Sequence, residues 1–117
     1  MTVGRVAITG LGLVSPYAPG EGLDDFFHRL CAGESAVRHL LTDDQPRPLN
    51  MPFVSCPDFD PDSALGKPLA SMMDRFAQLG MAAAFSAWDD AGLSRQSGEE
   101  NRDSWGCAWG TALGGTL

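Results

Sequence analysis

Cysteine and histidine are among the side chains in this sequence that could serve as nucleophiles, bases or metal ligands. The three cysteines, Cys31, Cys56 and Cys107, are widely spaced and form no Cys-x-x-Cys pair. An odd number without such pairing predicts neither a disulfide framework nor a zinc site, so reduced thiols in a cytoplasmic protein are expected. His28 and His39 are each isolated, and lone histidines are usually solvated or hydrogen-bonded. The spacing therefore predicts no metal site built from these residues.

Carboxylates alternate at Asp58, Asp60 and Asp62, as they do in calcium-binding loops. Ser63 stands where such a loop requires its glycine turn, and Leu69 stands where the closing glutamate belongs. This segment therefore predicts no cation site either.

The glycines of Thr9-Gly10-Leu11-Gly12 follow an apolar run and invite comparison with the dinucleotide-binding pattern Gly-x-Gly-x-x-Gly. Ser15 occupies the position of the last glycine, and Pro16 stands where the phosphate-binding helix should begin. The dipole of that helix would be displaced from the pyrophosphate. A dinucleotide-binding domain remains an alternative function, and tight NAD(P) binding would support it. No cofactor is otherwise predicted.

The composition fits one small globular domain. The chain has 117 residues, of which 44% are hydrophobic, and 15 acidic against 8 basic residues give a net charge of -7. This balance disfavours a phosphate-binding surface and argues against nucleic acid as a ligand. No stretch approaches the ~18 apolar residues of a membrane helix, so no membrane association is expected. Gly10 and Gly12 interrupt the apolar N-terminal run, and Pro19 follows Ala18, against a secretory signal.

Two elements are predicted near the N-terminus. The β-branched apolar run that begins at Val6 and extends to Val14 predicts a buried strand. A helix is predicted next, with acidic residues near its start and Gly33 as its C′ residue. Its apolar residues are spaced so that they share one face of the helix; they are Leu23, Phe26, Phe27, Leu30 and Cys31.

The middle of the chain, about residues 34–70, is predicted to be an irregular excursion. Its prolines break regular helices and central strands; they are Pro46, Pro48, Pro52, Pro57, Pro61 and Pro68. An excursion of this length usually belongs to a larger body. Ser71 then precedes a helix that runs to about Ala91 and ends at Gly92. Its broad apolar arc contains a stripe of small residues, which predicts close packing by more than one neighbour.

The last predicted element is a buried strand at residues 105–110, which leads into the glycine loop at residues 110–115. The order strand, helix, loop, helix, strand is typical of an α/β fold with a parallel crossover. These elements alone would leave large apolar faces unburied. The sequence ends two residues after the loop, and we expect most of the chemistry to lie beyond Leu117.

Three segments, in this order and spacing, resemble the N-terminal part of the β-ketoacyl-acyl-carrier-protein synthases, the condensing enzymes of fatty acid and polyketide assembly. They are Arg5–Pro16 with Leu30–Ser35, Phe59–Pro61 with Met73–Gln78 and Asp90–Leu93, and Gly106–Gly115. The resemblance implies an α/β, thiolase-like fold, of which residues 1–117 are an incomplete N-terminal portion of the first α/β half. It also implies a dimer, with itself or a related subunit, that acts on acyl groups held by an acyl carrier protein.

The family's catalytic cysteine and two histidines lie further along the chain than this sequence extends, so the resemblance assigns no catalytic residue here. A thiolate is needed in that chemistry because it is nucleophilic and leaves well from a thioester. The resemblance carries one substrate-binding position over: Leu113 falls where relatives place a bulky apolar residue that lines and gates the acyl pocket. A non-catalytic ketosynthase-like partner subunit, of the chain-length-factor type, remains an alternative to a synthase. For Leu113, the alternative to a pocket residue is an ordinary loop residue that packs on its own domain.

Overall fold

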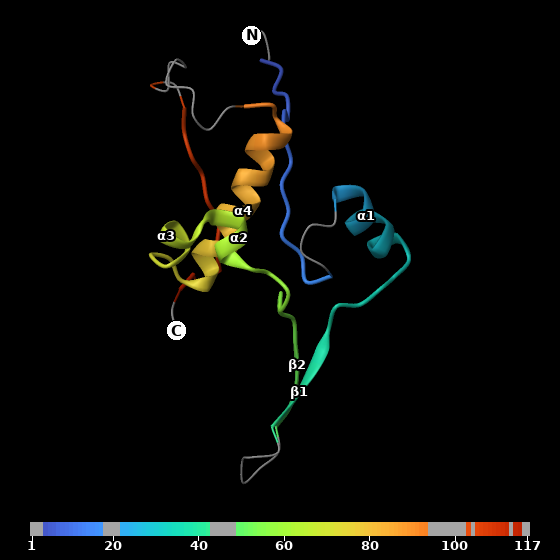
Figure 1. The fold of residues 1–117 in the computed structure, drawn as a ribbon. Coiled ribbons are helices and arrows are strands. Elements are labelled where there is room, and N and C mark those ends of the chain that lie inside the picture. The colour runs from blue at the N-terminus through green and yellow to red at the C-terminus, as the bar shows by residue number, and fades with distance from the viewer. Residues whose placement is uncertain are drawn as a thin grey trace. The chain divides into compact units, whose positions relative to one another are not determined.

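A computed structural model describes residues 4–17, 22–42, 49–93, 103, 105–112 and 114–115. The chain divides into two compact units (Figure 1). One unit combines Met1–Leu13 with Pro61–Leu117, and the other is Val14–Asp60.

The longest helix of the first unit is α4, Arg75–Asp90. Asp74 is its N-cap, because its Oδ1 accepts a hydrogen bond from the Ala77 N–H at 2.8 Å. The N-cap therefore lies three residues later than the predicted cap at Ser71, whose hydroxyl instead donates to the Pro68 carbonyl at 3.0 Å. The predicted end at Gly92 is confirmed: Leu93 N–H bonds to the Trp88 carbonyl at 3.2 Å in a Schellman arrangement.

The N-terminal segment runs extended alongside α4 (Figure 1). A Cβ on Gly10 would overlap the Ala87 carbonyl oxygen, and one on Gly12 would lie 3.0 Å from the Ala87 Cα. The Leu11 N–H donates to Asp90 Oδ2 at 2.8 Å. The small residues of α4 therefore serve close packing, as predicted, and the neighbour they admit is the backbone of this segment.

Two short helices, α2 (Pro61–Leu65) and α3 (Lys67–Ala70), precede α4 in the same unit. α2 packs against both α3 and α4. Pro61 begins the first helix and Pro68 lies in the first turn of the second, where a missing N–H is tolerated. Ala70, 2% exposed, is the only buried apolar residue in the described part of this unit.

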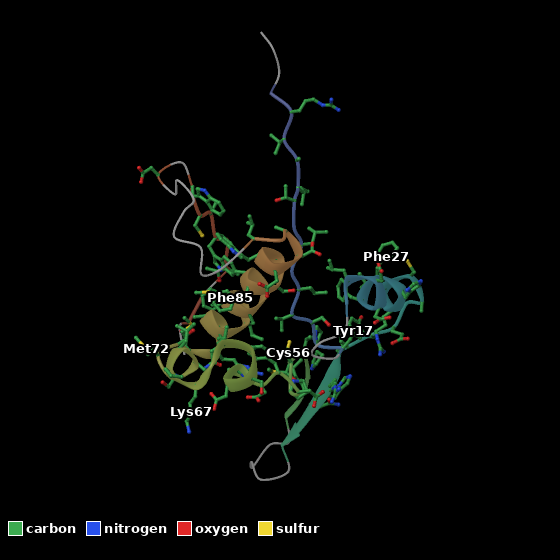
Figure 2. The ribbon with its side chains drawn as sticks, turned by 45° about the horizontal axis from the view of Figure 1, so that its top comes forward. Tyr17, Phe27, Cys56, Lys67, Met72 and Phe85 are labelled. Atoms are coloured by element: carbon green, nitrogen blue, oxygen red, sulfur yellow. The ribbon has the colours of Figure 1, made fainter. Side chains whose placement is uncertain are left out.

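Helix α1, Leu23–Cys31, opens the second unit's regular structure and matches the predicted helix. Glu34 N–H bonds to the Arg29 carbonyl at 3.0 Å, and Gly33 has a φ of 71°, so the predicted C′ glycine is confirmed. Arg29 also pairs with the Glu34 carboxylate at 2.7 Å. The apolar face, however, is not buried: Phe27 is 64% exposed and projects away from the helix (Figure 2).

The predicted irregular excursion contains a β-hairpin ladder, and that part of the prediction is wrong. β1 (Arg38–Thr42) pairs antiparallel with β2 (Leu49–Phe53). Pro52 lies opposite His39 within the ladder. A two-stranded ladder leaves one edge of each strand unpaired, so a residue that lacks an N–H is tolerated there.

The predicted strands at residues 6–14 and 105–110 do not form a ladder in the described part of the chain, and the predicted parallel crossover is absent from it. Both segments are extended but lack a neighbouring strand. Val6 is 96% exposed, and Trp109 is 55% exposed. Strand structure depends on a partner backbone, whereas a helix satisfies its own N–H and C=O groups. No helix in the described residues has the length and apolar character needed to cross a bilayer.

Candidate acyl-binding surface

An apolar cavity lies in the first unit, between α4 and the segment 105–110. Its volume is about 310 Å³. All of its lining side chains are apolar or sulfur-containing: Met73, Phe76, Ala77, Gly80, Met81, Ala84, Cys107 and Trp109. Gly80 allows this arrangement, because a Cβ there would overlap the Trp109 indole ring. A cavity of this size and character suits a hydrocarbon group.

The glycine loop that follows this segment folds back on the N-terminal end of α4. The Gly114 N–H donates to Thr111 Oγ1 at 3.0 Å, which closes the turn. Gly114 and Gly115 have φ values of 33° and 46°, in the left-handed region that glycine adopts without strain. A Cβ on Gly114 would lie 3.4 Å from the Phe76 ring. The loop and the start of α4 border a shallow depression of about 440 Å³.

Leu113, the predicted substrate-binding residue, lies outside the described residues. Its neighbours Ala112 and Gly114 are described, and Gly114 packs against the same Phe76 that lines the apolar cavity. The assignment of Leu113 to an acyl pocket therefore remains a prediction.

The three cysteines occupy different surroundings. Cys107 is exposed and lines the apolar cavity, whereas Cys56 is half-buried. Cys31 is exposed, as Phe27 is, so the expectation of a buried helix face is wrong for these two residues, whereas Phe26 on the same face packs edge-on against Tyr17 with 6.0 Å between the ring centroids. Among the described residues, no group of three cysteine, histidine or carboxylate side chains is placed to hold a metal ion.

His39 is hydrogen-bonded to a residue of the neighbouring strand. His39 Nδ1 lies 2.7 Å from the Asn50 Oδ1, across the β1–β2 ladder. A cross-strand hydrogen bond of this kind stabilises the hairpin and requires no catalytic role.

Gly10 and Gly12, which raised the dinucleotide-binding alternative, are explained by packing. Their missing side chains bring the segment against the backbone of α4, at Ala83, Ala87 and Ala91. These glycines therefore permit close approach to a helix. That helix occupies the space that a bound pyrophosphate would need.

Sequence reasoning did not single out Met81, Cys107 and Trp109 as lining residues of the apolar cavity. The signal was available in part: Met73, Phe76, Ala77, Gly80 and Ala84 belong to the apolar arc predicted for the α4 region. That Trp109 reaches Gly80 could not be read from the sequence, because the two residues are brought together only by the fold.

Comparison with known proteins places this arrangement in context. Residues 4–116 match the beta-ketoacyl synthase N-terminal domain family. The chain is 36% identical over 111 residues to 3-oxoacyl-[acyl-carrier-protein] synthase 2 of Coxiella burnetii, with 95% of this chain and 26% of that protein covered. It is 35% identical over 115 residues to polyketide beta-ketoacyl synthase 1 of Streptomyces halstedii, with 96% of this chain and 26% of that protein covered.

A third relative, the synthase 2 of Vibrio harveyi, is 33% identical over 115 residues, with 98% of this chain and 27% of that protein covered. The chain thus spans about a quarter of the length of these curated relatives. No solved structure gives a significant match. Because the family match extends over residues 4–116, nearly the whole chain, the chain belongs to the beta-ketoacyl synthase family, in the region of its N-terminal domain.

Proposed function

We propose that this chain is the N-terminal part of a condensing enzyme that joins an acyl thioester to malonyl-carrier protein, in fatty acid or polyketide assembly. The observation that carries the proposal is the family match over residues 4–116, in register with relatives whose names describe synthases of both pathways. The nucleophilic cysteine and the two histidines would then be supplied by polypeptide beyond the aligned region. Residues 1–117 alone would be inactive.

The fold of the whole enzyme would be thiolase-like, with residues 1–117 as part of its first α/β half. In that setting the segments at residues 6–14 and 105–110 would become strands, since a neighbouring strand would supply the backbone partner that each lacks in the described residues. The small-residue face of α4 supports this placement, because it is built for close packing on more than one side.

The substrate would reach the enzyme on an acyl carrier protein, and the enzyme would work as a dimer. Leu113 would line the acyl pocket, where a branched apolar side chain excludes water and contacts the growing chain. The apolar cavity beside α4 supports the view that this part of the chain is suited to hydrocarbon.

A replacement experiment tests the synthase function. Residues 4–116 are substituted for the aligned segment of the Coxiella burnetii relative, and the purified chimera is assayed for β-ketoacyl product with acyl and malonyl carrier substrates. We expect product from the chimera and none from the isolated chain. A chimera that melts cooperatively but forms no product would contradict the proposal.

The acyl-pocket role of Leu113 is tested in the same chimera by Leu113→Phe. A larger side chain in the pocket should lower kcat/KM for a long acyl donor by about tenfold, because it would take up the space needed by the far end of the acyl group. The value for a short donor should stay unchanged and serves as the internal control. An equal loss for both donors would indicate general damage rather than a pocket wall.

The alternative, a non-catalytic ketosynthase-like subunit, shares all the features described above. The residue at the family's nucleophile position decides between the two, and reading the DNA past the Leu117 codon would reveal it. Cysteine there supports the synthase. Another residue supports an accessory subunit, because no other side chain in the family's mechanism forms the acyl thioester.

A further inference from the structure

The Asp74 carboxylate has two oxygens with different neighbours. Oδ1 accepts the Ala77 N–H at 2.8 Å and so caps α4. Oδ2 faces the glycine loop: a Cβ built on Gly115 would overlap it, and the same Cβ would lie 3.4 Å from the Asp74 Cγ. One side chain thus contacts both the start of the helix and a residue 41 positions later in the sequence.

Three further observations describe the loop at this place. Thr111 Oγ1 accepts the Gly114 N–H at 3.0 Å. The Phe76 ring stands 3.4 Å from where a Gly114 Cβ would be, and the Thr111 methyl stands 3.2 Å from it. Both glycines have positive φ. Side chains at either position would therefore meet both backbone strain and a neighbour.

We propose that Asp74 is a positioning residue for the loop formed by Thr111, Ala112, Gly114 and Gly115, and that it acts by shape: its second oxygen sets how closely Gly115 approaches α4. The inference rests on the proposed function, in which this loop borders the acyl pocket. Its consequence is that acyl-chain selectivity depends on a residue that need not touch the acyl chain.

The substitutions at position 74 separate capping from positioning. Asp74→Ser keeps an N-cap oxygen but removes the second oxygen. Asp74→Asn keeps the shape of the side chain, so it can cap the helix and also fill the space beside Gly115. Gly115→Ala places a methyl group against Oδ2. Gly92→Ala is the matched control, because Gly92 also has positive φ, 69°, but has open space around its Cβ position.

The variants are made in the chimera described above and assayed with a long and a short acyl donor. We expect Asp74→Ser and Gly115→Ala each to raise KM for the long donor at least about fivefold, with kcat within about twofold and the short donor unaffected. Asp74→Asn and Gly92→Ala should leave both KM values unchanged. If Asp74→Ser behaves like the unmodified chimera, or if Asn fails to substitute for Asp, the proposal is wrong.

A second measurement does not depend on activity. The melting temperatures of Asp74→Ser, Gly115→Ala and the double variant are compared, in the chimera and in the 117-residue chain. Because serine makes room for the new methyl group, the double variant should lose less than the sum of the two single losses. Additive losses would overturn the contact. An inactive chimera that still shows this coupling would count against the synthase function and leave the contact standing.

Discussion

At the scale of single residues, several glycines in this chain are required by what lies against them. Gly10 and Gly12 let an extended backbone approach the backbone of α4, and Gly80 makes room for the Trp109 ring. In each case the sequence shows a small residue, but only the fold shows which neighbour uses the space. The same explanation replaces a phosphate-binding role for the first two glycines.

Gly12→Ala tests this packing directly. The new methyl group would overlap the Ala83 carbonyl oxygen, so we expect the free energy of unfolding to fall by about 1–3 kcal/mol, as in other overpacked sites. Denaturant titration of the chimera measures the change. Gly4→Ala is the control, because nothing lies within 4 Å of its Cβ position. Equal effects of the two substitutions would show that the segment does not pack on α4.

At the scale of elements, the two longer helices were predictable, whereas the strands and the short helices α2 and α3, which lie within the predicted irregular excursion, were not. The bounds of α1 and the end of α4 follow from local signals, namely apolar spacing and a C′ glycine. The start of α4 was misplaced because Ser71 and Asp74 are both good caps, and only the structure shows which one meets the free N–H groups. The β1–β2 ladder was missed because proline was taken to exclude strands, although Pro52 lies in one.

In the candidate site, too, local features were predictable and long-range contacts were not. The position of Leu113 in a glycine loop came from the family's sequence pattern, which is local. The contact of Asp74 with Gly115 joins two residues 41 positions apart, and no periodicity or motif signals it. Long-range contacts of this kind depend on how the chain folds back, which one sequence does not reveal.

The extended N-terminal segment offers a test at this scale. Val6 is 96% exposed and Ile8 is 81% exposed, so replacing both with serine should change the stability of the 117-residue chain by less than about 0.5 kcal/mol. In the chimera the same pair should cost several kcal/mol, because the segment would be a buried strand there. Denaturant titration of both proteins gives the comparison. Equal, small losses in both would mean that the segment does not become a buried strand in the enzyme.

At the scale of the whole molecule, the described residues bury little apolar surface. Phe59 at 6% exposure and Ala70 at 2% are the buried apolar residues among them, while large side chains such as Ile8, Phe27 and Met72 are exposed. Apolar faces of this extent on a monomer usually mark surfaces that other polypeptide covers. This agrees with the expectation from sequence and with a chain that spans about a quarter of its curated relatives.

The isolated chain should therefore behave as an uncovered part of a larger protein. We expect it to bind an apolar fluorescent dye strongly and to associate as its concentration rises, because exposed side chains such as Phe27, Met72 and Trp109 favour burial against one another. Sedimentation velocity over a range of concentrations measures the association, and the chimera, in which these faces would be covered, is the control for dye binding. Helix α1 should contribute to the effect, so Phe27→Ser should lower both signals while Asp24→Ser should not. A chain that stays monomeric over the whole concentration range and binds no dye would show that residues 1–117 cover their own apolar faces, and would contradict this prediction.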